Sequence, residues 1–359
     1  TSKSPDGLRP EVLPGPDLGT QAGAASVAHR LLRGPRDYAG ALVALVVILV
    51  VLATSRPGFA SSGNMQNVLQ YNTPLLLVSL GMTFVVISGG FDLSVGALMA
   101  LAEEVLMLLI NDAHISAPLA VLLTVLISGA VGGLLNGVAI GIAKLNFFVA
   151  TLASMILIQG IVLVASGGNT TVINSAWLQS MGNKIVVGVP VPVIIAVGLI
   201  VVAWFVLHMT TFGRAVYCIG GNREAARLSG ISVPVAVVGV YAVSGMFGAL
   251  AGVADAAHLS AATPTAGSNL ALTSAAAVLL GGASLAGGVG KVGGTVTGVL
   301  VLALLGNGVD LYGVSAYWQD VVTGAVLFVA ILLDRLHKSG ATGSLLRLLG
   351  PRRPVELDR

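Results

Sequence analysis

Charged residues are scarce in this sequence. Asp, Glu, Lys and Arg make up only 9% of its 359 residues, whereas an ordinary soluble domain has about 25%. Mean hydropathy is +0.95. So few charged side chains cannot cover the surface of a soluble enzyme with polar groups, and the composition therefore excludes that class of protein.

Cysteine is nearly absent too, because Cys218 is the one cysteine of the chain. This excludes an intramolecular disulfide and a cysteine-based metal site. No tract of Lys and Arg is present and the net charge is only +3, so we expect no nucleic-acid partner. The segment GGVGK at 287–291 is not a phosphate-binding loop, because Leu285 and Val292 stand where that motif needs Gly and Ser or Thr. The sequence therefore predicts neither an ATP site nor another cofactor.

Apolar residues are abundant instead, at 55% of the chain. Since one membrane-spanning helix needs about 20 residues, this content allows about ten. The apolar runs are long and continuous, unlike the short alternating strands of an outer-membrane barrel. We therefore expect an all-α polytopic membrane protein with about ten transmembrane helices, near 39–55, 74–88, 96–110, 118–143, 147–166, 189–208, 234–256, 271–286, 293–311 and 317–333. The segments 74–88 and 271–286 are short and flanked by glycines, so they are candidates for half-helices or re-entrant pieces.

The distribution of cations predicts the orientation. With ten spans and a cytoplasmic N-terminus, every Lys and Arg except Arg56 and Lys184 falls on the cytoplasmic side, as the positive-inside rule requires. Both termini are therefore expected in the cytoplasm of a multi-pass protein of the inner or plasma membrane. The polar segment 1–38 is interpreted as a disordered cytoplasmic tail. Residues 39–335 form the predicted membrane domain, with a cytoplasmic loop at 209–233, and 336–359 form a cytoplasmic C-terminal tail.

Glycines recur at helical spacing inside several predicted spans. Gly129, Gly133, Gly137 and Gly141 are four residues apart and therefore line one helix face. The pairs Gly248 with Gly252 and Gly294 with Gly298 have the same spacing. Such faces indicate close helix packing in lipid, where small residues let backbones approach. A gating hinge is the alternative interpretation.

Four motifs occur in order along the chain. The basic loop TTFGRAVYCIGGNREAARLSGI (210–231) contains the pattern E-A-A-x-x-x-G, which resembles the coupling motif of ABC importer permeases. GGFDLSVGALMAL (89–101) is similar to the GGIDLSVG segment of permeases that import pentoses and hexoses. FFVATLASMILIQGIVLVASGG (147–168) resembles their central span, and 280–327 resembles their C-terminal signature. The resemblance covers roughly residues 60–335. Without it, the loop would be an ordinary positive-inside connector.

The resemblance implies a permease subunit of a sugar ABC importer of the ribose, xylose, arabinose or galactoside type, which is not itself an enzyme. It implies a separate ATP-binding subunit, an extracytoplasmic sugar-binding protein, a homodimer or heterodimer of permeases, and surrounding membrane lipid. The residues it assigns to ATPase coupling are Gly213, Arg214, Glu224, Ala225, Ala226 and Gly230. Those it assigns to family motifs or gating are Gly89, Gly90, Asp92, Leu93, Ser94, Gly96, Gly281, Gly282, Ser284, Gly287 and Gly288.

The loop pattern also has a physical interpretation. Good helix formers lie between glycines, so a short helix is expected there. Ala225 and Ala226 are small enough for the wall of a partner's groove to approach the backbone. Glu224 suits the start of the helix, and Gly230 can end it in a left-handed conformation.

Several acids lie within or beside predicted spans. Asp92 is expected to accept hydrogen bonds from the start of the next helix, with a contact to the sugar as the alternative. Placing the charged carboxylates of Glu103 and Glu104 within a membrane costs free energy. As neighbours on a helix, their side chains point about 100° apart. We therefore expect one or both to be protonated or to face the protein interior, with different partners, and a contact with the substrate is the alternative. Asp255 and His258, at i and i+3, are predicted to form a polar pair and not a metal site.

Candidates for the sugar path are side chains that hydrogen-bond hydroxyls, namely Asn146, Gln159, Asn307 and Gln319. A helix–helix hydrogen bond is the alternative role for each. The sequence leaves the cargo open between a monosaccharide, a polyol and a furanose-like signalling molecule. An ion-coupled secondary transporter, supported by Glu103, Glu104 and Asp255 alone, is the rival mechanism, and a purely structural membrane subunit is a third alternative.

Overall fold

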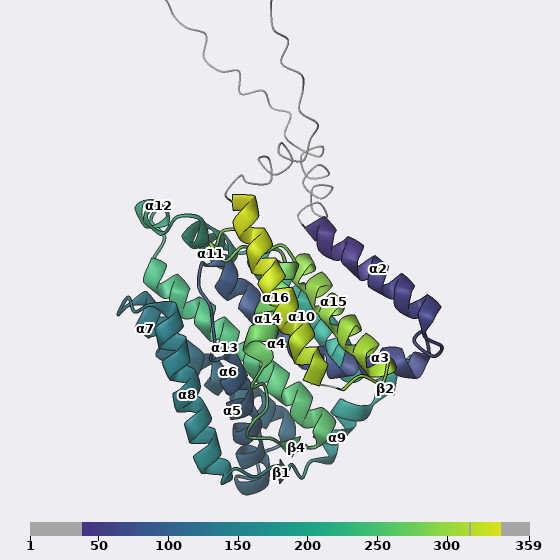
Figure 1. Ribbon diagram of the computed structural model, residues 1–359. Helices are drawn as coiled ribbons and strands as arrows, with labels where there is room; N and C mark the ends of the chain where they lie inside the picture. The colour runs from purple at the N-terminus through teal and green to yellow at the C-terminus, as the bar shows by residue number, and fades with distance from the viewer. Residues whose placement is uncertain (1–37, 316, 339–359) are drawn as a thin grey trace, which may run out of the picture. The chain divides into compact units, whose positions relative to one another are not determined.

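The computed structural model describes residues 38–315 and 317–338, which are almost entirely helical (Figure 1). Two two-stranded ribbons are also present. In one, β1 (Thr171–Val172) pairs antiparallel with β4 (Ala261–Ala262), and in the other β2 (Ile185–Val186) pairs with β3 (Val189–Pro190). The predicted tails 1–38 and 336–359 lie outside the described residues except for Tyr38 and the end of the last helix.

Every predicted apolar segment overlaps a helix, although the helix in 271–286 ends at Leu280. In chain order the elements are α2 (Ala39–Ser55), α3 (Ser62–Tyr71), α4 (Thr73–Ile87), α5 (Val95–Met107), η2 (Leu108–Asp112), α6 (Ala117–Gly132), η3 (Gly133–Gly137), α7 (Val138–Gly141), α8 (Phe147–Ser166), α9 (Ala176–Asn183), α10 (Val191–Met209), α11 (Thr211–Gly221), α12 (Arg223–Leu228), α13 (Val233–Leu259), α14 (Leu270–Leu280), α15 (Val292–Leu311) and α16 (Tyr317–Lys338).

Five of the described helices are long and apolar enough to cross a membrane. They are the continuous run Ala117–Gly141, α8, α10, α13 and α15. The pair α3 and α4 counts as a sixth if their bend of 42° is accepted within one span. Helix α14 has only 11 residues, which agrees with the short helix expected for the segment 271–286.

Helices α4, α5 and α13 form the centre of the fold, and α6 packs against α13 from another side (Figure 1). All fifteen residues of α4 except Leu76 are buried, which matches a helix that is apolar on every face. Helices α2, α8 and α10 are peripheral and expose large apolar side chains such as Val47, Val164 and Val201. In a membrane these side chains would face lipid.

Glycines set the distance between α13 and its neighbours. A Cβ on Gly137 would lie 2.6 Å from the Val238 Cα, and one on Gly132 would lie 2.6 Å from the Tyr241 carbonyl oxygen. Gly252 of α13 approaches the Met99 backbone of α5 equally closely. The predicted close packing of the glycine faces is therefore confirmed. The segment Gly133–Gly137 is also a π-helix, a rare local geometry that often marks functional positions.

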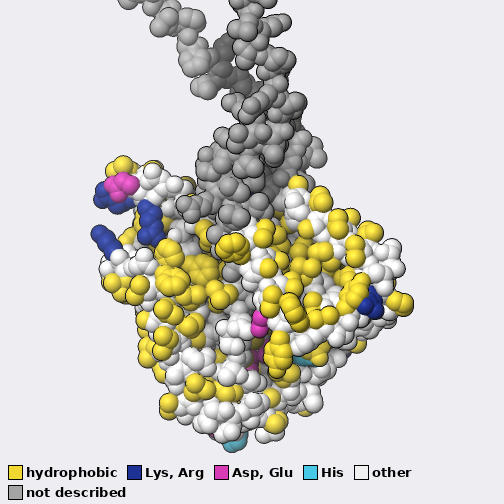
Figure 2. Space-filling model, in the orientation of Figure 1, with side chains coloured by type: hydrophobic (Ala, Val, Ile, Leu, Met, Phe, Trp, Pro, Cys, Tyr) yellow, Lys and Arg dark blue, Asp and Glu magenta, His cyan; other side chains and the backbone are white. Residues whose placement is uncertain are grey.

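The two ends of the helix bundle differ in charge. Helices α11 and α12 lie at the same end as the start of α2 and the end of α16, whereas α3, α9 and the two ribbons lie toward the opposite end (Figure 1). On the face drawn in Figure 2, basic side chains gather at the corner of α11 and α12, and hydrophobic side chains cover most of the rest. Arg56 lies over the Tyr312 ring, at the end away from α12.

The glycine packing generates a stability test. Gly137→Val would push α6 and α7 away from the Val238 backbone, and overpacking of this kind costs about 1–3 kcal/mol. We expect a lower unfolding temperature of the purified protein in detergent. Gly198→Val in α10 is the matched control, because a Cβ there meets no atom within 4 Å. Equal unfolding temperatures for the two variants would contradict the packing role.

Candidate functional site

Asp92 is at the centre of a buried polar network where the chain enters α5. Its Oδ1 accepts hydrogen bonds from the Ser94 backbone N–H (2.9 Å) and the Ser94 hydroxyl (2.6 Å), and its Oδ2 accepts one from the Ser244 hydroxyl (2.7 Å). The Asn136 amide donates to the Ser94 Oγ at 2.7 Å. All four side chains are buried, so these bonds offset the cost of burying a carboxyl group. The network joins the loop before α5 to η3 and α13.

Asp92 therefore contacts the backbone at the start of the next helix, as the sequence predicts. Asn136 and Ser244 are the partners that sequence reasoning missed. Each is a polar residue within an otherwise apolar stretch of helix, and that is the signal that could have identified them.

Three loops meet where the glycine motifs converge. A Cβ on Gly287 would lie 2.8 Å from both the Gly220 carbonyl oxygen and the Gly89 Cα, and one on Gly220 would overlap the Ile87 carbonyl oxygen. The Gly288 N–H donates to that Ile87 oxygen at 2.8 Å. Gly89 and Gly287 have φ of +78° and +84°, conformations that glycine adopts without strain. We call this contact of Ile87, Gly89, Gly220, Gly287 and Gly288 the glycine junction.

The glycine junction holds α11 against the membrane domain. Tyr217 of α11 donates its hydroxyl hydrogen to the Gly290 carbonyl at 2.8 Å, and burial raises the pKa of Tyr217 to about 12, so the phenol stays protonated and can donate. The structure therefore brings together the motifs at 89–96 and 281–288, which are almost 200 residues apart in sequence. Gly220 completes the contact and was not predicted.

The other motif residues form separate contacts. Gly96 approaches the Gly267 backbone, and Gly281 approaches the Gly294 backbone at the crossing of α14 and α15. Gly282 has φ of +86° in the turn after α14. Ser284 Oγ accepts a hydrogen bond from the Ala286 N–H at 3.3 Å, within the loop that supplies Gly287. These residues shape turns and helix crossings.

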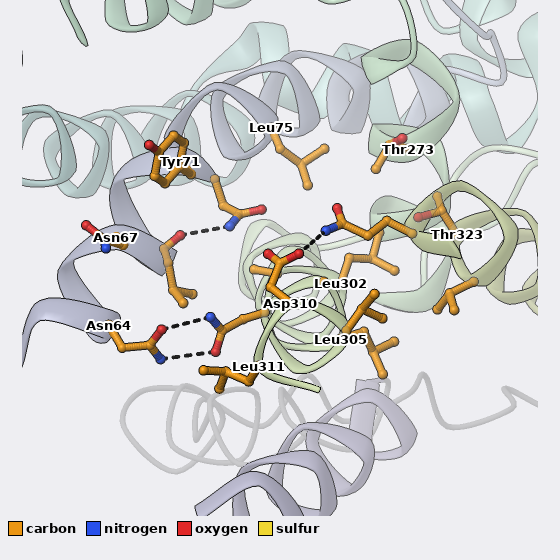
Figure 3. A pocket seen from close by; sticks show the side chains of 18 residues that line it. Asn64, Asn67, Tyr71, Leu75, Thr273, Leu302, Leu305, Asp310, Leu311 and Thr323 are labelled. Atoms are coloured by element: carbon orange, nitrogen blue, oxygen red, sulfur yellow. Dashed lines mark hydrogen bonds between the residues drawn. The ribbon is translucent and has the colours of Figure 1, made fainter. Parts of the chain in front are cut away.

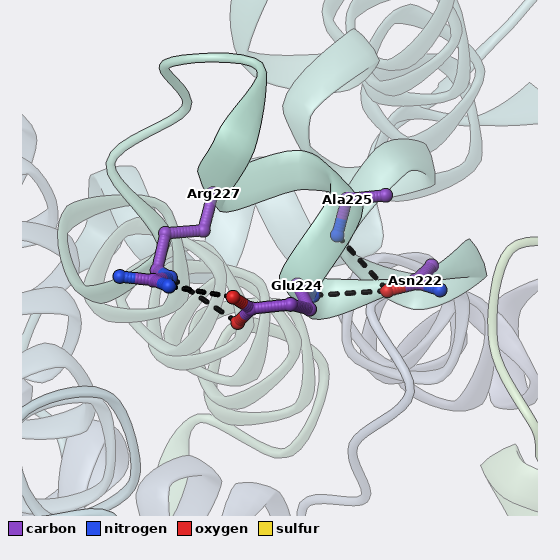
Figure 4. Close-up of polar contacts among 4 residues, drawn as sticks. All are labelled: Asn222, Glu224, Ala225 and Arg227. Carbon is purple, nitrogen blue, oxygen red and sulfur yellow. Dashed lines mark hydrogen bonds and ion pairs between the residues drawn. The ribbon is translucent and has the colours of Figure 1, made fainter.

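The basic loop folds into α11 and the six-residue α12. Asn222 caps α12, with its Oδ1 accepting from the Glu224 and Ala225 N–H groups at 3.0 Å each (Figure 4). The Arg227 Nε donates to Glu224 Oε2 at 3.1 Å. This hydrogen bond lowers the pKa of Glu224, so its contribution to α12 is present at neutral pH and is lost only as the pH falls through that lowered pKa. Gly230 ends the helix with φ of +83°, as predicted.

The structure corrects the prediction for Ala226. Ala226 is 3% exposed and packs against Ile219 and Ala236 of the same chain, so its side chain is not available to a partner's groove. Ala225 is exposed, and Leu228 at the tip of α12 is 77% exposed. Sequence reasoning missed Leu228, the last residue of α12, because its exposure is visible only in the structure.

Gly213 and Arg214 lie at the start of α11. The Gly213 N–H donates to the Thr210 Oγ1 at 3.1 Å, and a Cβ on Gly213 would overlap the Leu207 carbonyl oxygen. Gly213 is therefore required by the sharp turn between α10 and α11. Arg214 is exposed.

A polar cavity of about 580 Å³ is lined by residues of α3 and its neighbours (Figure 3), and α3 lies away from α12 in Figure 1. Helices α3, α4, α14, α15 and α16 line it. Its lining includes nine side chains with polar atoms, namely Asn64, Asn67, Tyr71, Asn72, Thr273, Asn307, Asp310, Gln319 and Thr323. Asn64 and Asn307 exchange two hydrogen bonds (3.1 and 2.9 Å), and the Gln319 amide donates to Asp310 Oδ1 at 2.8 Å. We call this space the outer cavity.

Two of the four predicted path residues line the outer cavity, namely Asn307 and Gln319. Asn146 caps α8 by accepting from the Phe148 N–H at 2.9 Å, and Gln159 donates to the Pro264 carbonyl at 2.7 Å. Asn146 and Gln159 therefore make structural hydrogen bonds, the alternative to a role in the sugar path. The sequence reasoning missed Asn64, Asn67 and Asp310. Their spacing was an available signal, because Asn64 and Asn67 are three residues apart and so share a helix face. The same spacing places Asp310 on the face of Asn307.

The intramembrane acids lie away from the outer cavity. Glu103 and Glu104 are 0% and 3% exposed, so both face the interior as predicted. Glu103 Oε2 accepts the Thr263 N–H at 2.8 Å. The Nδ1 of His258 lies 2.6 Å from the Gln70 Nε2. Within the described residues no group of three metal-binding side chains occurs.

Comparison with known proteins places these features in a family. The family model described as "Branched-chain amino acid transport system / permease component" matches residues 64–331. No solved structure matches the chain.

Named relatives match over most of their length. The ribose import permease protein RbsC of Bacillus subtilis is 41% identical over 84% of this chain and 94% of its own, and RbsC of Escherichia coli K12 is 39% identical over 82% and 92%. The D-allose transport system permease protein AlsC of E. coli K12 is 33% identical over 84% and 92%. On the strength of these matches, and in agreement with its apolar spans, the chain belongs to the permease-component family of ABC importers, a family of multi-pass proteins of the inner membrane.

Proposed function

We propose that this chain is the membrane-spanning subunit of an ATP-driven importer that carries a monosaccharide, or a sugar-like polyol, by alternating access. Ribose and D-allose are the sugars named for its relatives. A separate subunit would bind and hydrolyse ATP, an extracytoplasmic protein would deliver the sugar, and two permease chains, identical or different, would enclose the path within the lipid. A furanose-like signalling molecule carried by the same machinery is the alternative cargo.

The observation that carries this proposal is the position of α4. Near its start, Leu75 lines the outer cavity. At its end, the Ile87 carbonyl accepts the Gly288 N–H in the glycine junction, directly beside α11. One buried helix thus connects the polar cavity to the loop that we propose docks on the ATPase. A displacement of α11 and α12 would move α4, and with it the wall of the cavity.

The proposed topology has ten spans with both termini in the cytoplasm. Its support is the gathering of basic side chains at the corner of α11 and α12, the two helices that carry Arg214, Arg223 and Arg227 (Figure 2). Arg56 instead follows the end of α2 that lies beside α3 (Figure 1). The outer cavity would then open outside the cell, where a delivering protein would reach it.

Reporter fusions test this topology. Fusions at Gly221 and after Lys338 are expected to give cytoplasmic signals, whereas a fusion near Asn174, beside β1, is expected to give an external signal. Cells expressing each fusion at comparable levels provide the measurement. An external signal at Gly221 would contradict the ten-span orientation.

Coupling is tested at the exposed tip of α12. We propose that Leu228 inserts into the ATPase subunit, so Leu228→Asp would place an unpaired charge in that interface and reduce ATP-driven sugar uptake at least about ten-fold. Co-purification of the ATPase should fall as well. The matched control is Val187→Asp, because Val187 is 98% exposed in the turn between β2 and β3 and lies away from α12. Normal co-purification and uptake for Leu228→Asp would show that α12 does not dock.

The rival ion-coupled mechanism is tested through Glu103. Its carboxyl accepts the Thr263 N–H, and Glu103→Gln keeps an oxygen that can accept this bond while it removes the titratable group. We expect uptake by this variant to remain within about two-fold of the parent, because the net worth of one hydrogen bond is small. Uptake by the parent should also survive an uncoupler while ATP is maintained. Loss of uptake in both experiments would favour proton coupling.

A further inference from the structure

The outer cavity contains one formal charge among its described lining residues, the carboxylate of Asp310. The described residues that line it include no lysine, arginine or histidine. The guanidinium carbon of Arg56 lies 3.6 Å from the centre of the Tyr312 ring, and the described residues show no ion pair between Arg56 and Asp310. Among the described residues the recorded ion pair is that of Glu224 with Arg227. Among the described lining residues, a ligand in this cavity therefore meets one negative charge and no positive one.

Gln319 fixes the orientation of this carboxylate. Its Nε2 donates to Asp310 Oδ1 at 2.8 Å from a different helix, α16. Figure 3 shows Asp310 pointing from α15 into the space between the α3–α4 side and α16. Oδ2 has no recorded partner, so it remains free to accept hydrogen bonds. A carboxylate accepts only, through as many as four lone-pair positions, and neighbouring hydroxyl groups supply the donors that it needs.

The rest of the lining also suits an uncharged polyhydroxy compound. Asn67 has no recorded hydrogen bond, and Thr273 and Thr323 add hydroxyl groups. The ring of Tyr71 is 67% exposed and is held edge-on to His258 with ring centres 5.1 Å apart. An aromatic ring of fixed orientation provides an apolar surface for the C–H face of a sugar.

We infer that Asp310, oriented by Gln319, makes the outer cavity a selectivity filter of the permease itself, which binds neutral sugars and excludes anionic ones such as sugar phosphates and sugar acids. The inference rests on the proposed function, because it assumes that the cavity belongs to the sugar path. It adds selection by charge within the membrane subunit to the selection made by the delivering protein.

The experiment measures protection of a cysteine in the complete transporter, held in lipid nanodiscs without nucleotide. The parent carries Cys218→Ala, which removes the one native cysteine, and Asn67→Cys as the reporter for a water-soluble maleimide. Thr273→Cys is a second reporter, in case the first disturbs binding. D-ribose and D-ribose 5-phosphate are the two probes.

In the parent we expect D-ribose to slow labelling and D-ribose 5-phosphate to require a concentration at least about ten-fold higher, because like charges repel at close range. Asp310→Asn should raise the half-protecting concentration of D-ribose about ten-fold, since hydrogen bonds to a charged group are lost. It should also abolish the discrimination between the two probes. Asp320→Asn is the matched control, because Asp320 is exposed on the same helix as Gln319 and does not line the cavity.

The outcomes separate the inference from the proposed function. Equal protection of the parent by both probes, or unchanged discrimination in Asp310→Asn, would overturn the charge filter. Absence of protection at either reporter, with ATP-driven D-ribose uptake intact in the parent, would show that the outer cavity is not the sugar site, although the import function would stand. Absence of D-ribose uptake in a parent that retains its ATPase and delivering protein would contradict ribose import, and the filter with it.

Discussion

Contact between backbones at glycines is the constraint on which the structure depends. Lipid gives apolar helices no hydrophobic reason to associate, so stability comes from close packing. Without Cβ atoms at Gly132, Gly137 and Gly252, helix α13 can approach both α6 and α5 closely enough for their backbones to touch. These contacts keep α4 and α5 enclosed, and the enclosed helices hold the Asp92 network and the glycine junction in place.

The same packing separates two regions of different chemistry. At one end, α11 and α12 present cations and an exposed leucine on a capped, glycine-terminated helix. At the other end, five helices surround a cavity with amide, hydroxyl and carboxylate groups. Helix α4 is buried along its length and reaches both regions, so in the proposed mechanism its displacement would link them.

Polar residues have two distinct roles in this chain, one in its buried interior and one at the exposed lining of the outer cavity. Asp92, Ser94, Asn136 and Ser244 hydrogen-bond mainly to one another, and therefore fix the positions of helices. Asp310 and Gln319 pair with each other but leave acceptor positions open toward the cavity. A polar group whose hydrogen bonds are all made within the protein fixes the packing of helices. A polar group with an unused acceptor position can bind a ligand.

The sequence by itself determined the helical class, the positions of all ten apolar segments, the glycine faces and the left-handed end of α12 at Gly230. These follow from periodicity, composition and local backbone preference, which act over a few residues. Only the tertiary structure decided that Gly89, Gly220 and Gly287 meet, that Ala226 faces inward, and that Asn307 and Gln319 share a cavity while Asn146 and Gln159 do not. These facts depend on which helix faces which, a choice made by packing between segments far apart in the chain.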